Sequence, residues 1–597
     1  MIIFINPSTF DLCIAATLGR FLSQKIFVHG NKNPIKNSFY KSVDLNQIDT
    51  NGILKLFNYP ADFRLRSYVN DFGNSKIIRK SARKYRRVSK AKEKLDLLSA
   101  STLDYQGAGT VFAFASRAKI QNERIIIVNC KLKDYLFQDY ELYDECVMQF
   151  PLLVTELFNA PINAWNKLIQ LLKKPSHKYS PSCITSSETQ KSTGTLKKHI
   201  AVFYHKDTAY GTHYEKNHYF SLDTSSDLHE SKLIKYILYP ENRDRDDLID
   251  FTPVFYPILF LKSFIYFISL NLCFSSFRSR KLSIRLSYYY FQYLSWERML
   301  NSYELTDAII DYDVLFPKPL SLALETQGVK TIAFQERPAF SMQNLLYGVI
   351  TDVYFFSGNI WKRYANDRRS VIAQTVKSFA PWRAKYFNEC TYNLLESDYH
   401  KPLRKVDAKS KKIVFLGYFL SEESYVCCRT AIDKFLEYVS GVASQFPSSM
   451  ILIRMKDLDK NTLDYLLGSV GSFSNIYIST DYQHFGLSYA LCRDADVIVS
   501  VQTSLAEECL YYGKKVVFLD NIGSVINMCE DIYPPEFNFM YVASVSELIE
   551  KLNDIFDRKH CLLAKYKNLG SELLGDWNPY VENSIPLAIE EVLSRNQ

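Results

Sequence analysis

The segment from Asp494 to Asp520 constrains the fold of this chain most, because it reads as strand, turn, helix, turn and strand. Val497 to Val501 is a short apolar run rich in β-branched residues, which predicts a strand buried on both faces. The helix that follows stops at Gly513, and Val516 to Leu519 supplies the next strand. This order is the repeating unit of a parallel α/β sheet.

Polar residues follow the first strand of this unit at its carboxyl end. Ser500, Thr503 and Ser504 carry hydroxyls that can cap a helix, and a helix N-terminus can bind an anion. Glu507 lies in the first helical turn. Its negative charge there interacts favourably with the helix dipole, or its carboxylate could accept hydrogen bonds from a ribose or sugar hydroxyl. Ligands of open α/β sheets bind at the carboxyl ends of strands, so the three hydroxyl residues are candidates for binding a phosphate or diphosphate group, and Glu507 is a candidate for binding a ribose or sugar hydroxyl.

The same alternation recurs elsewhere, and 597 residues are too many for a single core. We expect an α/β fold with two Rossmann-like lobes and an interlobe cleft. The N-terminal lobe, with helical and loop insertions, spans 1–396, a linker spans 397–410, and the C-terminal lobe spans 411–597. Further strands are expected at Met1–Asn6, Lys25–His29, Arg124–Asn129, Ala308–Asp311, Val329–Phe334, Val353–Ser357, Lys412–Leu416, Met450–Arg454 and Ile476–Ser479.

The composition narrows the class of protein. With 47% apolar and 23% charged residues the chain is globular, and a net charge of +8 over this length does not imply a nucleic-acid partner. Forty-two Tyr and forty Phe suit a large core or faces that stack on carbohydrate. Twelve Cys occur without paired metal-ligand spacing, and the N-terminus lacks the features of a secretory signal. We therefore expect a reduced, cytoplasmic location and no metal site.

Contact with a membrane is one of the interpretations of two segments. The basic run 76–94 is interpreted as a solvated helix face, a membrane-surface patch or a site for an anionic acceptor. The apolar segment 251–277 and the basic, aromatic segment 278–298 predict buried core helices, peripheral contact with the inner membrane, or a span. Lys262 opposes a span, because a central Lys costs about 3 kcal/mol on insertion.

Charged residues that could perform chemistry follow two expected strands. Asp311 and Asp313 come after one of them, and Gln335, Glu336 and Arg337 come after the next. Because parallel strands end at the same sheet edge, the carboxylates could divide the roles of nucleophile, acid and base. Arg337 could neutralise an anionic substrate or pair with one of them. Turn and helix-cap roles are the alternative for all five.

A third group lies in the C-terminal half. Arg454 and Lys456 occur where a strand is expected to end, so their charges could meet phosphates at the edge of the sheet; a salt-bridged surface turn is the alternative. The chain lacks the GxxxxGK[ST] phosphate loop, GxGxxG after its first strand, HExxH and GxSxG. P-loop hydrolysis, common nicotinamide chemistry, zincin proteolysis and α/β-hydrolase chemistry are therefore poorly supported.

At Asp496–Ser500, Thr503-Ser504, Glu507-Glu508 and Gly513–Phe518 the chain resembles the C-terminal half of GT-B glycosyltransferases. Among these, bacterial surface-polysaccharide enzymes are the most similar, including Kdo transferases and polymer glycerophosphotransferases. The resemblance extends over about 300–540, where 311–313 and 335–338 look like the end of the N-terminal half. The His-Pro signature of the glycerophosphotransferases is missing, and Arg454 to Lys456 occupies the corresponding strand end.

The resemblance implies a metal-independent glycosyltransferase. It would move a sugar from a nucleotide-activated donor, CMP-Kdo or a similar acidic sugar among the candidates, to a cell-surface polysaccharide or lipid-linked glycan acceptor, with no other cofactor. Asp311 or Asp313 would act as nucleophile and Glu336 as acid or base. A nucleotide-sugar epimerase of the same architecture and a non-catalytic scaffold are the alternatives.

Overall fold

The chain divides into two compact units. Unit 1 comprises Met1–Pro60, Thr102–Leu196 and Pro253–Tyr303, and unit 2 comprises Ala61–Ser101, Lys197–Thr252 and Glu304–Gln597. The computed structural model describes residues 2–5, 26–29, 45–47, 76–100, 125–128, 147–149, 199–204, 232–238, 249–251, 253, 256–271, 277–310, 316–335, 349–368, 371–379, 387, 398–403, 410–417, 429–455, 460–481, 485–501, 503–519, 535–574, 588–589 and 591–593.

Unit 1 contains a five-stranded sheet in which every pairing is parallel. Its order is β3-β2-β1-β4-β5. The strands are β1 (Ile2–Ile5), β2 (Ile26–His29), β3 (Leu45–Gln47), β4 (Ile125–Val128) and β5 (Val147–Gln149). The strands expected at Met1–Asn6, Lys25–His29 and Arg124–Asn129 are thus confirmed as β1, β2 and β4.

The first sheet of unit 2 has seven parallel strands in the order β14-β12-β10-β9-β6-β7-β8. Every residue of β9 and β12 is buried, and both strands are apolar apart from Asp307 at the start of β9. Helix α12 packs on β10, and α14 packs on β12 and β14. The elements are β6 (His199–Tyr204), β7 (Lys232–Ile237), β8 (Ile249–Asp250), β9 (Asp307–Ile310), α12 (Lys318–Thr326), β10 (Lys330–Phe334), β12 (Val353–Phe356), α14 (Asn359–Arg368) and β14 (Thr375–Ser378), with β11 (Val349–Ile350) and β13 (Val371–Ile372) paired separately.

The second sheet of unit 2 has six parallel strands in the order β17-β16-β15-β18-β19-β20. Helix α21 begins with a reciprocal cap, in which Ser544 accepts from the Glu547 amide and Glu547 accepts from the Ala543 amide. The elements are β15 (Lys412–Gly417), α16 (Arg429–Gln445), β16 (Met450–Met455), α17 (Lys460–Val470), β17 (Ile476–Ile478), α18 (Phe485–Asp494), β18 (Val497–Ser500), α19 (Ser504–Leu510), β19 (Val516–Leu519), η7 (Pro535–Met540), β20 (Tyr541–Val542), α21 (Val545–Phe556) and α22 (His560–Leu574).

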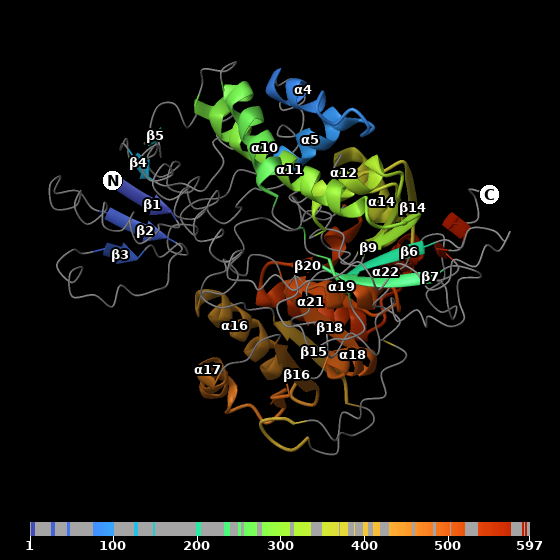
Figure 1. The fold of residues 1–597 in the computed structure, drawn as a ribbon. Helices are drawn as coiled ribbons and strands as arrows, with labels where there is room; N and C mark the ends of the chain where they lie inside the picture. The colour runs from blue at the N-terminus through green and yellow to red at the C-terminus, as the bar shows by residue number, and fades with distance from the viewer. Residues whose placement is uncertain are drawn as a thin grey trace. The chain divides into compact units, whose positions relative to one another are not determined.

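The first five strands of each sheet follow one order. Figure 1 shows strands of all three sheets, among them β1, β6 and β15. Numbered along the chain within each sheet, the strands run 3-2-1-4-5. The second sheet of unit 2 continues to strand 6, which is the Rossmann order, and the first sheet of unit 2 adds a seventh strand, β14, beyond strand 6. The expected α/β class with Rossmann-like lobes is therefore confirmed. The range 1–396, expected as one lobe with insertions, contains two separate sheets, β1 to β5 and β6 to β14.

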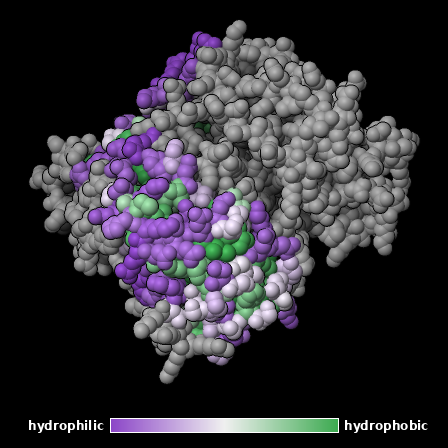
Figure 2. Space-filling model, turned by 180° about the vertical axis from the view of Figure 1, so that it is seen from behind, coloured by the Kyte–Doolittle hydropathy of each residue, from purple (hydrophilic) through white to green (hydrophobic). Residues whose placement is uncertain are grey.

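Aromatic side chains in the first sheet of unit 2 form core. Phe203 packs against Tyr236, Phe251 and Phe316 with ring centroids between 5.0 and 5.7 Å apart, and all four are buried. These rings therefore do not form a face for stacking on a sugar. Hydrophilic residues cover most of the described surface on the face shown in Figure 2, where hydrophobic residues occur in small groups.

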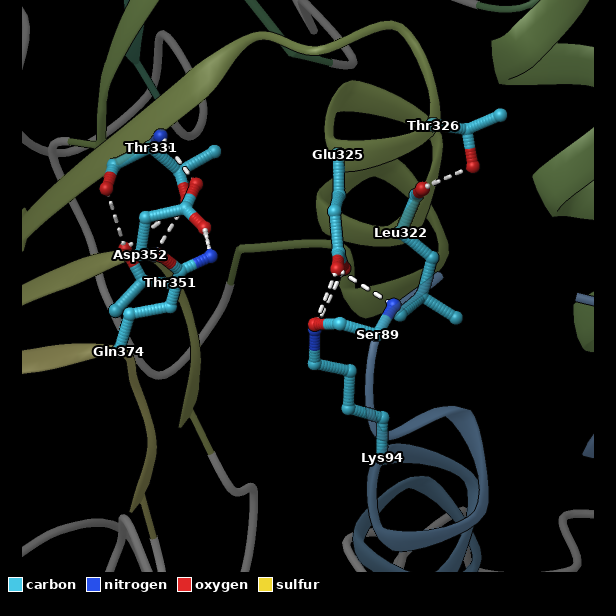
Figure 3. Close-up of polar contacts among 9 residues, drawn as sticks. All are labelled: Ser89, Lys94, Leu322, Glu325, Thr326, Thr331, Thr351, Asp352 and Gln374. Carbon is cyan, nitrogen blue, oxygen red and sulfur yellow. Dashed lines mark hydrogen bonds and ion pairs between the residues drawn. The ribbon is translucent and has the colours of Figure 1, made fainter. Parts of the chain in front are cut away.

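The carboxylate of Glu325 in α12 contacts a segment that contains two short helices. Glu325 accepts hydrogen bonds from the backbone amide and hydroxyl of Ser89 at 2.8 and 2.6 Å, and its other oxygen lies 2.5 Å from Lys94 Nζ (Figure 3). These contacts connect α4 (Lys76–Ala82) and α5 (Ala91–Ala100) to the first sheet of unit 2. Part of the basic segment 76–94 is therefore packed against α12, and Lys94 is buried there.

Two helices of unit 1 form an antiparallel pair, α10 (Pro257–Asn271) and α11 (Phe277–Leu300). Arg298 lies 4.1 Å from the ring centroid of Tyr256, and the rings of Tyr266 and Tyr290 meet edge to face at 5.0 Å. Among the described residues, no helix combines the length and the apolar content needed to cross a bilayer.

Candidate functional site

The carboxyl ends of β9 and β10 lie side by side at the centre of the first sheet of unit 2. Ile310, the last residue of β9, pairs with Ala333 in β10. The strand order reverses between β6 and β9, and such a switch point is where open α/β sheets bind ligands. The four charged residues expected to act here follow these strands outside the described residues: Asp311, Asp313, Glu336 and Arg337.

Gln335 is the one candidate at this edge that the structure describes, and it is buried. Its Oε1 accepts a hydrogen bond of 2.9 Å from the Ser357 amide, and its backbone carbonyl accepts one of 3.0 Å from the Ser357 hydroxyl. The side chain therefore positions the loop that follows β12. Direct donor binding by Gln335 stays a prediction.

That loop approaches α22 closely at Gly358. Its φ of +112° lies in the region that L side chains rarely adopt. A Cβ at this position would lie 2.2 Å from the Leu573 carbonyl oxygen. Only glycine therefore allows the carboxyl end of β12 to contact the end of α22.

Tyr511 connects the same loop to the second sheet of unit 2. Its hydroxyl donates to the Ser357 carbonyl, 154 positions away along the chain. Burial, and then the negative charge of Glu507, raises the pKa of Tyr511 well above its ordinary value. The phenol is therefore a neutral donor at physiological pH, and Gln335, Ser357 and Tyr511 form one buried chain of hydrogen bonds between the two sheets.

Further contacts join the two sheets around this chain. Phe387 stacks on Tyr512 with ring centroids 4.5 Å apart, and Trp361 packs against Phe537 at 5.5 Å. The segment 591–593 is attached to the first sheet as well, since Lys377 pairs with Glu591 at 3.0 Å and Lys330 donates to the Val592 carbonyl at 2.9 Å. Unit 2 thus holds its two Rossmann-like sheets together through buried aromatic and polar contacts.

Ser500 and Thr503 lie where the sequence predicts them, at the carboxyl end of β18. Thr503 caps α19, since its Oγ1 accepts from the Ala506 amide at 3.2 Å, and it lies 3.1 Å from Ser500 Oγ. Ser500 is fully buried and its hydroxyl also donates to the Val501 carbonyl. Ser504 is the first residue of α19. Both described hydroxyls shape this turn, and their contact with a phosphate stays a prediction.

Glu507 lies in the first turn of α19 and is only 1% exposed. Its neighbour Glu508 is buried as well and accepts a hydrogen bond from the Tyr489 hydroxyl in α18. Both carboxylates therefore lie within the packing of α18 and α19.

Arg454 lies near the carboxyl end of β16 and is buried. Its guanidinium donates to Ser488 Oγ and Ser479 Oγ, each at 3.0 Å, and to the Asp481 carbonyl. It therefore fixes the loop after β17 and the first half of α18, whereas a surface turn was the alternative expected from the sequence. Lys456, two residues further on, lies outside the described residues.

A second polar cluster lies at the opposite edge of the first sheet, at the amino ends of its strands. Asp352 accepts from the Thr331 amide and hydroxyl at 2.8 and 2.9 Å, and from Gln374 at 2.8 Å (Figure 3). The Thr351 hydroxyl donates to the Thr331 carbonyl. Since ligands bind at the carboxyl ends, we assign this cluster to sheet stability.

The described residues thus fix the backbone at the carboxyl ends of the strands in both sheets. The charged residues that could react, such as Asp311 and Glu336, follow these strand ends in the sequence. Within the described part of the chain, no group of His, Cys, Asp and Glu is placed to bind a metal ion. Sequence reasoning missed Ser357, Gly358 and Tyr511. A Ser-Gly pair directly after the buried strand Val353–Phe356 was the available signal for the first two, and Tyr511 carried none.

Comparisons with known proteins gave only distant structural matches. No protein-family model matches the chain, and neither does any curated protein. Among solved structures, UDP-GlcNAc 2-epimerase from Neisseria meningitidis bound to UDP-GlcNAc matches with 13% identity and a TM-score of 0.39, covering 67% of this chain and all of that one.

Two further solved structures are similar at the same level. A putative UDP-N-acetylglucosamine 2-epimerase from Listeria monocytogenes has 11% identity and a TM-score of 0.42, with 67% of this chain and 97% of that chain covered. The wall teichoic acid polymerase TagF has 8% identity and a TM-score of 0.36, with 67% and 88% covered. At these values the matches carry no argument about activity.

Proposed function

We propose that this chain is a GT-B-type glycosyltransferase. It transfers a sugar from a nucleotide-activated donor to a cell-surface polysaccharide or a lipid-linked glycan. The observation that carries the proposal is the pairing of β9 with β10 beside the switch point of their sheet, since both strands lead directly into charged residues. The second sheet of unit 2 has its own switch point between β15 and β18.

In the proposed reaction the bond between the anomeric carbon and the donor phosphate breaks, and the nucleotide leaves with the electron pair. Asp311 or Asp313 either attacks the anomeric carbon or stabilises its positive charge. The acceptor oxygen then forms the new glycosidic bond, and the carboxylate leaves the carbon with its electron pair where it had bonded to it. Glu336 takes the proton of the acceptor hydroxyl. The departing phosphates are bound by Arg337, Lys456 and the turn after β18. The loops around them are held in place by Gln335, Arg454 and Thr503.

The test begins with binding, because the donor is not identified. Thermal shifts are measured with CMP-, UDP-, GDP- and CDP-linked sugars, CMP-Kdo among them. One class should raise the melting temperature, and Lys456→Ala should weaken its binding by about tenfold through loss of a charge-assisted contact. Failure of every donor class to bind would identify a non-catalytic scaffold.

Turnover is then measured as nucleotide release with and without glycan acceptors. We expect release that depends on the acceptor, and a loss of roughly 100-fold or more in Asp311→Asn, Asp313→Asn or Glu336→Gln. Glu550→Gln, at an exposed position of α21, is the matched control and should keep full activity. Full activity in all three variants rules out the assigned chemistry, and conversion of the sugar without acceptor indicates an epimerase.

A further inference from the structure

Helix α10 exposes the face that is more apolar than the face it buries. The buried side includes Leu259, Ser263, Tyr266 and Leu270. The α10 face on the opposite side consists of six side chains that are between 41% and 58% exposed: Ile258, Phe260, Leu261, Phe264, Ile265 and Ile268. An amphipathic helix at a water-facing surface shows the reverse arrangement, so the α10 face is suited to a non-aqueous contact.

The α10 face is continuous. At 100° per residue its six side chains cover an arc of about 160°. Lys262 is the single charged residue of α10, and it is exposed beside this arc. A Lys at that position can extend its ammonium group to the headgroup layer while its stem stays in apolar surroundings. The helix, about 22 Å long, is therefore shaped to lie along an interface rather than across it.

The charge of the surrounding segment indicates the partner. Between Phe251 and Trp296 the chain has no Asp or Glu and five basic residues: Lys262, Arg278, Arg280, Lys281 and Arg285. Four of the five occur in the first three turns of α11, which is paired with α10. An apolar helix face accompanied by positive charge alone complements an anionic lipid surface.

A protein partner fits the same observations less well. Half-exposed side chains of this size leave roughly 90 Å² each in contact with water, or about 550 Å² for the six. A stable complex buries about 800 Å² on each partner and places polar groups around its rim. We propose that the α10 face, together with the basic start of α11, docks unit 1 on the surface of an anionic phospholipid bilayer.

The primary test is co-sedimentation of the full chain with vesicles of phosphatidylcholine alone or mixed with phosphatidylglycerol. We expect binding to the mixed vesicles that weakens with added salt. The double variant Leu261→Glu with Ile265→Glu changes two exposed residues, so it should fold normally and bind at least about tenfold more weakly. Ser448→Glu with Ser472→Glu adds the same charge at exposed turns of unit 2 and should bind as the parent does.

A second measurement distinguishes a bilayer from a protein partner. In Phe264→Trp the new indole should shift its emission to the blue on vesicle addition and be quenched by brominated lipids, relative to the parent chain. Absence of binding to mixed vesicles at low salt overturns the proposal, as does unchanged binding by the double Glu variant. Self-association that the double Glu variant abolishes, without vesicle binding, would assign the face to a second copy and overturn it as well.

Discussion

Gln335 and Arg454 have equivalent roles in the two sheets of unit 2. Each is a buried polar side chain at the carboxyl end of a strand, and each fixes the loop that follows the neighbouring strand. Gln335 holds the Ser357 amide after β12, and Arg454 holds Ser479 after β17. A buried donor left without its acceptor costs about 1–3 kcal/mol, so both residues position backbone at the edges where ligands are expected.

The role of these strand edges can be tested at Gly358, where the backbone after β12 lies close to the Leu573 carbonyl of α22. Gly358→Ala places a Cβ against the Leu573 carbonyl at a φ of +112°, and should lower the free energy of unfolding by about 2 kcal/mol or more. Gly468→Ala is the matched control, because nothing lies within 4 Å of its Cβ.

Gly468 lies inside α17, so its replacement by Ala should stabilise the chain by about 0.5–1 kcal/mol. Chemical denaturation of the parent and both variants makes the comparison. Equal effects of the two substitutions would show that the contact between Gly358 and α22 is not as tight as the structure has it.

At the scale of elements, part of the expected linker 397–410 is attached to the edge of the second sheet. Tyr399 forms a bridge with Ser479, and the His400 amide donates to the Ile478 carbonyl at 3.1 Å. The Ile478 amide in turn donates to His400 Nδ1 at 2.8 Å, and Lys401 lies 4.7 Å from the ring centroid of Tyr477. Segment 398–403 therefore extends the sheet at β17.

This attachment should depend on pH. Burial, and then the positive charge of Lys401, lowers the pKa of His400 below its ordinary value, and Nδ1 accepts a hydrogen bond only without a proton. The unfolded chain takes up a proton at about pH 6.5, before the folded chain does. The contribution of His400 is therefore complete above that pH and is lost as the pH falls toward the lower pKa of the folded state.

Denaturation midpoints measured between about pH 5 and pH 8 should show this loss, and His400→Gln should reduce the slope. Ser472→Gln, which introduces the same side chain at an exposed turn, should leave the slope as it is in the parent. An unchanged slope in His400→Gln would mean that other groups account for the pH dependence.

At the scale of the molecule, unit 2 combines two sheets of the same strand order through a few buried contacts. The Tyr511 hydroxyl, the stacked pair Phe387 and Tyr512, and the contact of Gly358 with Leu573 all join an element of one sheet to the other. Such contacts fix the position of one set of strand ends relative to the other. In the proposed reaction, that position would decide whether a donor and an acceptor can meet.

Tyr511→Phe removes one of these contacts while keeping the ring. It leaves the Ser357 carbonyl without this donor, and should lower the free energy of unfolding by about 1–3 kcal/mol. Tyr465→Phe is the control, since the Tyr465 hydroxyl donates a hydrogen bond to Asp433 at the exposed surface between α17 and α16. We expect this variant to lower the free energy of unfolding by about 0.5 kcal/mol or less. If the two variants lose the same stability, the buried contact does not couple the sheets.

The central strands could be predicted from the sequence because a strand buried on both faces is apolar over most of its length. Val497–Ser500, Val516–Leu519 and Met450–Met455 all lie within a residue of their expected bounds. The turn at Thr503 was predictable for a similar reason, since a cap is a local contact. Patterns of this kind depend on neighbours a few residues away.

The contacts of Arg454 and Tyr511 depend on residues far along the chain. Arg454 looked available for phosphate, and only the fold surrounds it with Ser479, Asp481 and Ser488. Tyr511 is one of 42 tyrosines, and its bond to Ser357 arises only when two sheets meet. By itself the sequence determined the α/β class, the buried apolar strands such as β15, β16 and β18, and the candidate edges, because the burial pattern and capping are local. It did not predict β6, β7 or β14. The tertiary structure alone decided which polar side chains build the frame and that α10 turns its more apolar face outward, because both depend on what packs against each residue.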